Sequence, residues 1–129
     1  MPVIENLLIV DDEPDLRDVL AYVLADSVTS VQMAANGKEA LPIIQKGKID
    51  VVLSDINMPE MNGLELLAEV RRQGLDTPFV FLTAYGDAEK RAEAQRLGAS
   101  DFLEKPFKKP HVIAAMQKAF EQAKAKKSP

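Results

Sequence analysis

The chain has 129 residues, of which 47% are hydrophobic, and it carries a net charge of −4 and no cysteine. This length suits one domain with a buried core, so we expect residues 1–129 to form a single domain. The lack of cysteine excludes disulfides, thiolate zinc sites and cysteine nucleophiles, and the acidic balance argues against direct nucleic-acid binding. No apolar run approaches the ~20 residues of a membrane span, and the N-terminal residues lack a secretory pattern, so we expect a cytoplasmic protein that does not contact the membrane.

The first predicted strand, 7–10, is a continuous apolar run that ends at an acidic pair. A helix is expected over about 14–24, where Pro14 suits the first turn and Asp12 is a candidate N-cap. The β-branched, partly alternating stretch 28–33 predicts the second strand.

A second helix is expected from about 36 to 47, with a kink or a weakened turn at Pro42. The short apolar run 51–53 predicts the third strand. Apolar side chains at helical spacing over 64–74, followed by a terminal glycine, predict the third helix.

The remaining elements repeat the same alternation. We expect strands at 79–82 and 101–104, a helix at about 88–98 between them, and a last helix at about 110–123. Residues 124–129 are expected to form a frayed tail.

Five strand–helix units in succession, over about residues 5–123, predict an α/β fold. Continuous apolar strands are typical of a parallel sheet that is covered on both faces. We therefore expect a doubly wound sheet in three layers, with right-handed crossovers between neighbouring strands.

Polar side chains stand where four of the predicted strands end: Asp11 and Asp12, then Asp55, Thr83 and Lys105. The carboxyl ends of parallel strands meet at one edge of the sheet, where such folds bind ligands. We therefore expect three carboxylates, a hydroxyl and an ammonium group to converge there.

Clustered carboxylates repel one another and raise each other's pKa, which a divalent cation would relieve. Oxygen ligands without cysteine favour a hard ion such as Mg²⁺, for which Mn²⁺ could substitute. Lys105 and Thr83 add groups suited to phosphoryl oxygens, and a carboxylate can be the nucleophile that forms an aspartyl-phosphate.

At these strand ends the chain resembles the response-regulator receiver domain (CheY-like), the phospho-accepting half of two-component signalling. The resemblance covers nearly the whole chain and rests on LIVDDE at 8–13, DVVLSDINMP at 50–59, LTA at 82–84 and KPF at 105–107. It implies a flavodoxin-like (βα)5 fold with a five-stranded parallel sheet of order 2-1-3-4-5.

The resemblance also implies individual roles. Asp55 matches the phosphoacceptor, and Asp12, Asp55 and the backbone carbonyl of Asn57 match direct Mg²⁺ ligands. Asp11 matches a residue that orients metal-bound water. Asn57 and Tyr85 lie close enough to the site in sequence to tune the access of water.

Thr83, Ala84 and Lys105 match the positions that bind the phosphoryl group. Phe102 matches an aromatic switch residue, whose ring turns inward when Thr83 moves toward the phosphoryl group. The Lys105–Pro106 peptide bond is expected to be cis by similarity, which proline permits at a cost of ~0.5–1 kcal/mol.

The implied phosphodonor is a phosphohistidine on a histidine kinase or phosphotransfer protein. The implied output is a protein target that docks on the face of the fourth helix, fifth strand and fifth helix. Such a domain catalyses only its own phosphorylation and dephosphorylation, and it is either a stand-alone receiver or a piece of a longer chain.

Three alternatives stay open at this point. An aspartyl-phosphate-forming phosphohydrolase would place a second acid two residues after its nucleophile, and the pair Asp11 and Glu13 matches that poorly. A nucleotide or flavin binder would need a glycine-rich turn, which the loop 11–14 lacks. A receiver-like adapter without chemistry would not need the complete acidic set.

Overall fold

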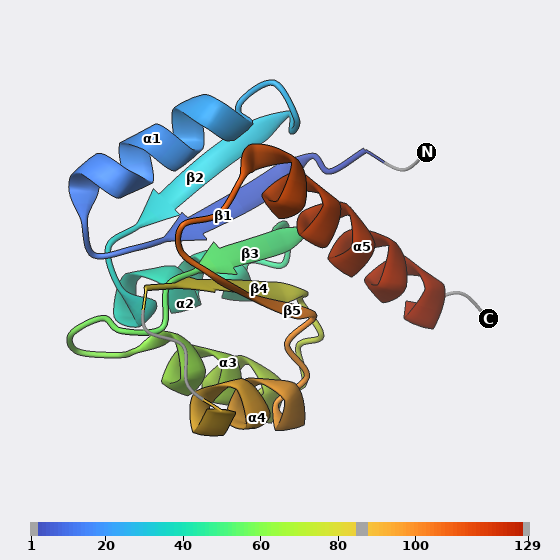
Figure 1. Cartoon of the computed structure of the whole chain (residues 1–129). Coiled ribbons are helices and arrows are strands. Elements are labelled where there is room, and N and C mark those ends of the chain that lie inside the picture. Colours follow the sequence, from blue (N-terminus) through green and yellow to red (C-terminus); the bar gives the residue numbers. More distant parts are fainter. Residues whose placement is uncertain (1–2, 85–87, 128–129) are drawn as a thin grey trace.

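The computed structural model of the chain describes residues 3–84 and 88–127. Five parallel strands form one sheet of order β2-β1-β3-β4-β5, as predicted (Figure 1). The strands are β1 (Asn6–Val10), β2 (Ser30–Ala34), β3 (Val51–Ser54), β4 (Phe79–Thr83) and β5 (Asp101–Glu104). With five intervening and flanking helices, this is the predicted flavodoxin-like α/β fold.

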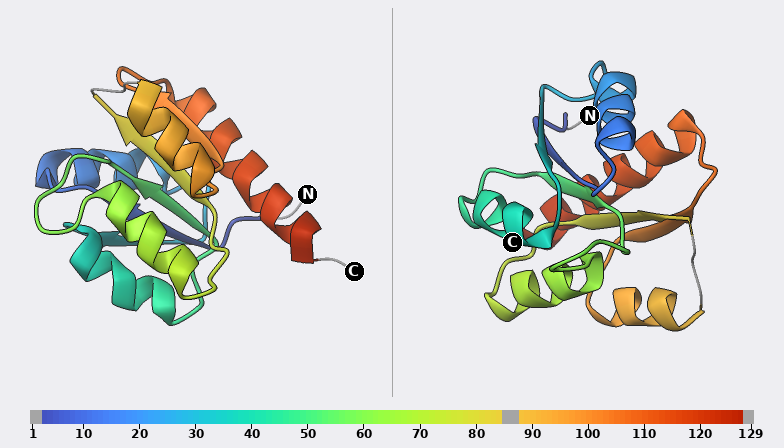
Figure 2. Two further views of the ribbon diagram at one scale, coloured as in Figure 1. Left: turned by 90° about the horizontal axis from the view of Figure 1, so that it is seen from below. Right: turned by 90° about the vertical axis from the view of Figure 1, so that its left-hand side faces the viewer.

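The helices cover both faces of the sheet and make three layers (Figures 1 and 2). One face carries α1 (Pro14–Leu24) and α5 (Lys109–Lys127), and the other carries α2 (Gly37–Gln45), α3 (Gly63–Arg72) and α4 (Ala88–Arg96). The sheet has one hydrophobic core on each face, and alternate residues of β1 point into them. Leu7 and Ile9 pack with α1 and α5, and Leu8 and Val10 pack with α2 and α3. This explains why the central strands are apolar without interruption.

The sheet's edge strand β2 differs from its centre. Every residue of β3 and β4 is buried, whereas β2 is largely exposed and only Ala34 is buried within it. The strand begins at Ser30, two residues later than predicted, and Val28 is buried ahead of it. The stretch 28–33 thus marks the strand correctly but places its start too early, and its apolar residue Met33 is exposed.

The first helix corrects one prediction. Its N-cap residue is Glu13, which makes no side-chain capping hydrogen bond, so Asp12 does not cap the helix. The Glu13 amide instead donates to the Asp11 carboxylate at 2.9 Å. The physical reason is that the acidic pair turns toward the edge of the sheet and not toward the helix end.

Two further helices are more continuous than the sequence suggested. Helix α2 is capped by Asn36 and continues through Pro42, which has no N–H to give to the preceding turn. Helix α5 runs on to Lys127, into the segment 124–129 that we expected to be frayed. Lysine and alanine there favour helix, and the Lys124 ammonium lies 4.9 Å from the centre of the Phe120 ring.

Each helix on the face of α2, α3 and α4 is followed by a glycine with positive φ. Gly74 follows α3 with φ 78° and Gly98 follows α4 with φ 86°, a conformation that glycine adopts without strain.

In the part of the chain that the structure describes, no helix has both the length and the apolar character that crossing a membrane requires.

Candidate functional site

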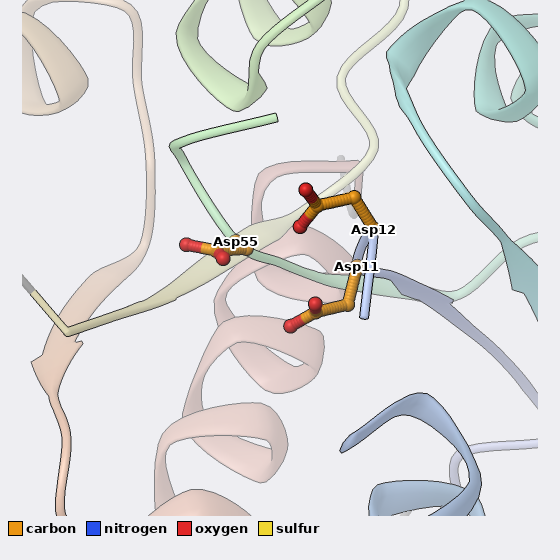
Figure 3. Close-up of side chains that lie close together, drawn as sticks. All are labelled: Asp11, Asp12 and Asp55. Atoms are coloured by element: carbon orange, nitrogen blue, oxygen red, sulfur yellow. The ribbon is translucent and has the colours of Figure 1, made fainter. Parts of the chain in front are cut away.

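Three carboxylates meet at the carboxyl edge of the central strands (Figure 3). Asp11 and Asp12 follow β1, and Asp55 follows β3, and one carboxylate oxygen from each lies within 4.8 Å of the others. The pairing of β1 with β3 sets this distance, because Val10 lies opposite Ser54 and its carbonyl accepts the Asp55 N–H at 2.9 Å. The predicted convergence of the acidic residues is therefore present.

Lys105 supplies the positive charge of the site. Its Nζ atom lies 3.9 Å from Oδ2 of Asp11 and 3.9 Å from Oδ2 of Asp55. Its backbone N–H donates to the Thr83 carbonyl at 2.8 Å, which fixes the residue just beyond β5. The peptide bond to Pro106 is cis, as expected.

Burial governs the electrostatics of the acids. Asp11 is 2% exposed and Asp55 is 7% exposed, and desolvation raises the pKa of both carboxyls above the ordinary value. For Asp55 the Lys105 ammonium and the Ile56 N–H, which donates at 2.7 Å, oppose this rise in pKa. For Asp11 the Glu13 N–H opposes the rise in pKa, and the charge of Asp55 adds to it. Further positive charge beside these two buried acids would therefore lower the pKa of both and favour their ionised forms.

This donor set fits a hard divalent cation. It offers carboxylate oxygens only, and Asp12 is the most accessible of the three acids, which leaves room for the waters that Mg²⁺ retains. Asn57 lies exposed at the rim, two residues after Asp55. Its side-chain Oδ1 accepts a hydrogen bond from the Lys90 ammonium of α4 at 3.0 Å.

The backbone beneath Asp55 is closely packed. Ser54 Oγ donates to the Asp55 carbonyl at 2.7 Å, and a Cβ on Gly63 would lie only 2.4 Å from that same oxygen. Gly63 also donates its N–H to the Ile56 carbonyl at 2.9 Å. Glycine is thus required at the start of α3, a close approach that no sequence pattern marks.

The other predicted site residues within the described chain lie on β4 and β5 or directly after β4. Thr83 is fully buried at the end of β4, and Ala84 follows it on the surface. Phe102, on the adjacent strand β5, is 5% exposed, and its ring lies edge-on to Phe81 with centroids 6.5 Å apart. Tyr85 lies outside the described residues.

Helix α4 contributes a residue that the sequence analysis missed. The Arg91 guanidinium lies 4.6 Å from the centre of the Phe102 ring and donates to the Phe102 carbonyl at 3.3 Å. It also lies 3.7 Å from a Glu104 carboxylate oxygen. Arginine on a polar helix has no distinguishing sequence pattern, so only the folded chain identifies this contact.

The model of the response regulator receiver domain family matches residues 7–117. This chain belongs to that family. Receiver domains are regulatory parts of response regulators in two-component systems, where they interact with histidine kinases and downstream effectors. The assignment favours a regulatory domain over a phosphohydrolase or a nucleotide binder.

Relatives and solved structures agree with the family. The chain is 40% identical over 114 residues to an uncharacterized 14.6 kDa protein from the sodA1 3′ region of Leptolyngbya boryana, covering 87% of each. It is 38% identical to the transcriptional regulatory protein DltR of Streptococcus agalactiae, where 87% of this chain spans 50% of the relative. The chemotaxis protein CheY4 of Vibrio cholerae superimposes with a TM-score of 0.82 at 36% identity, covering 91% of this chain and 99% of CheY4.

Proposed function

We propose that this receiver domain accepts a phosphoryl group on Asp55 in a Mg²⁺-dependent reaction, and that the change alters its partner-binding face. The observation that carries the proposal is the approach of three carboxylates and one ammonium group to a single point. Asp11 and Asp55 are buried there, and Lys105 lies 3.9 Å from both. Buried acids kept together without a binding role would only destabilise the domain.

The acidic residues would contact the cation in two ways. The proposed direct ligands are the carboxylates of Asp12 and Asp55 and the backbone carbonyl of Asn57. Asp11 would orient metal-bound water. When bound, Mg²⁺ offsets the repulsion among the carboxylates and neutralises charge on the phosphoryl oxygens, and Mn²⁺ could take its place.

The phosphodonor is a phosphohistidine on a histidine kinase or a phosphotransfer protein. A carboxylate oxygen of Asp55 forms a bond to phosphorus as the phosphorus–nitrogen bond breaks, and the electron pair returns to the imidazole nitrogen. Lys105 favours the ionised form of Asp55 that this step requires, against the effect of burial on its pKa. Lys105, the Thr83 hydroxyl and the Ala84 backbone then bind the phosphoryl oxygens.

The phosphoryl group carries about −1.5 to −2 charges and three strong acceptors to the edge of the sheet, in place of the single negative charge of the Asp55 carboxylate. We propose that Thr83 moves toward the new group and that Phe102, on the neighbouring strand, responds as the switch residue. Arg91 contacts Phe102 from α4, so a change at the ring would reach the face of α4, β5 and α5. That face is the proposed docking surface for a downstream protein. The proposed location of the protein is the cytoplasm.

Mass spectrometry tests the phosphoacceptor directly. The wild-type protein, incubated with MgCl₂ and acetyl phosphate, should gain the mass of one phosphoryl group. Asp55→Asn should gain none, and the exposed control Asp15→Asn should gain as much as wild type. Labelling of Asp55→Asn would show that the acceptor is another residue, and labelling that survives a chelator would remove the metal from the mechanism.

A receiver-like adapter without chemistry predicts no gain of mass in any variant. A phosphohydrolase predicts repeated turnover of a phosphomonoester, which a second incubation with p-nitrophenyl phosphate measures as released p-nitrophenol. The two incubations together separate the three functions.

A further inference from the structure

The rim of the acidic site carries a contact between two segments that are far apart in sequence. The Lys90 ammonium donates to Oδ1 of Asn57 at 3.0 Å, across 33 positions of the chain. Asn57 lies two residues after Asp55, and Lys90 lies near the start of α4. A hydrogen bond from a charged donor is stronger and more directional than one between neutral groups.

The contact spans two segments that leave neighbouring strands at the acidic site. Asn57 belongs to the segment that leaves β3, and Lys90 belongs to the helix that follows β4. Strands β3 and β4 are hydrogen-bonded neighbours that end near Asp55 and Thr83. The contact therefore joins the two segments that border the site on its solvent side.

Helix α4 depends on such contacts more than the other helices do. Its sequence, AEKRAEAQR, is polar, and Ala94 is the buried residue within it. With little apolar surface to fix its N-terminal half, the side chains of Lys90 and Arg91 tie that half to the site and to β5. Loss of Lys90 would free the Asn57 side chain without emptying the core.

We propose that Lys90 is a positioning residue that holds the Asn57 amide across the approach to Asp55 and slows hydrolysis of the aspartyl-phosphate. This rests on the proposed function. In hydrolysis a water oxygen bonds to phosphorus as the phosphorus–oxygen bond to Asp55 breaks. The electron pair of that bond restores the Asp55 carboxylate, and inorganic phosphate leaves with the water oxygen and its two protons. Keeping the amide fixed at the rim restricts the path of that water.

The test measures the first-order loss of the phosphoryl mass after the donor is removed. Lys90→Met should shorten the lifetime about five-fold, and Lys90→Arg, which keeps a charged donor, should stay within about two-fold of wild type. Lys118→Met removes the same charge from an exposed position on α5 and should leave the lifetime unchanged.

A double-mutant cycle separates positioning from a simple charge effect. In an Asn57→Ala background, Lys90→Met should cause no additional change in lifetime, because the residue through which Lys90 acts is gone. An equal effect in both backgrounds would overturn the proposal in favour of through-space electrostatics. Equal lifetimes for wild type and Lys90→Met would overturn it outright.

A second readout needs neither metal nor phosphoryl group. In ¹H–¹⁵N spectra of the metal-free protein, the side-chain amide signals of Asn57 should shift in Lys90→Met and stay near wild type in Lys118→Met. Unchanged Asn57 signals would refute the contact itself. A wild-type protein that takes up no phosphoryl group would overturn the proposed function together with this inference, whereas normal uptake with unaltered lifetimes would overturn this inference alone.

Discussion

The acidic site and helix α4 are neighbours that are held in place by different means. Asp55 continues a fully buried strand, and its backbone carbonyl is in contact with Ser54 and closely approached by Gly63. Helix α4 buries Ala94 and is otherwise tied by the long side chains of Lys90 and Arg91. The rigid centre thus positions the chemistry, and the loosely packed helix is free to respond to it.

The largest effect should come from crowding the rigid centre. In Gly63→Ala the new Cβ would fall 2.4 Å from the Asp55 carbonyl oxygen, so the backbone must shift. We expect a loss of about 3 kcal/mol in the free energy of unfolding, measured by urea denaturation. Gln122→Ala, on the exposed side of α5, should change it by less than about 0.5 kcal/mol. A Gly63→Ala variant as stable as wild type would show that the centre is not rigid.

A smaller effect should follow from loosening α4. Arg91→Ala removes the guanidinium that lies over Phe102 and donates to its carbonyl, and we expect a loss of about 1 kcal/mol. Arg96→Ala on the same helix removes an exposed ion pair with Glu93 and should cost less than about 0.5 kcal/mol. Equal losses in the two variants would mean that the contact with Phe102 does not anchor the helix.

The smallest effect concerns the pH dependence of the metal-free protein. Burial raises the pKa of Asp55 above 3.8, so the folded state binds this proton more tightly than the unfolded state does. The contribution of Asp55 to stability is therefore greatest below the ordinary pKa and is lost as pH rises through the raised pKa. Urea midpoints in EDTA at pH 4 and pH 7 should fall less for Asp55→Asn than for wild type, with Asp15→Asn behaving as wild type. A pH-independent difference between wild type and Asp55→Asn would contradict this assignment.

The charged residues of the rigid centre could be predicted from the sequence, and the contacts of α4 could not. Apolar runs placed the strands, and the parallel order brought Asp11, Asp12, Asp55 and Lys105 to one edge. The prediction that Asp12 caps the first helix was wrong. Asp12 lies instead with Asp11 and Asp55, a placement that local capping preference does not predict. The burial of Phe102 by its neighbours likewise depends on which elements pack together.

The contact of Lys90 with Asn57 joins segments that are not consecutive in the chain, and that of Arg91 with Phe102 depends on how α4 packs against β5. Lysine and arginine on a polar helix usually face solvent, so their composition gives no sign of a partner. The requirement for glycine at position 63 also has no sequence signal. It arises because the folded chain brings Asp55 and Phe81 so close to Gly63 that a Cβ atom would clash.

The central claim is that Asp11, Asp12 and Asp55 are gathered to bind a divalent cation beside Lys105. Calorimetric titration of MgCl₂ into the protein tests it most directly, with Asp12→Asn as the variant and the exposed Asp15→Asn as its control. We predict saturable binding of one ion by wild type and Asp15→Asn, and an affinity lower by roughly ten-fold or more in Asp12→Asn. Absence of binding by wild type, or equal affinities in all three proteins, would contradict the account.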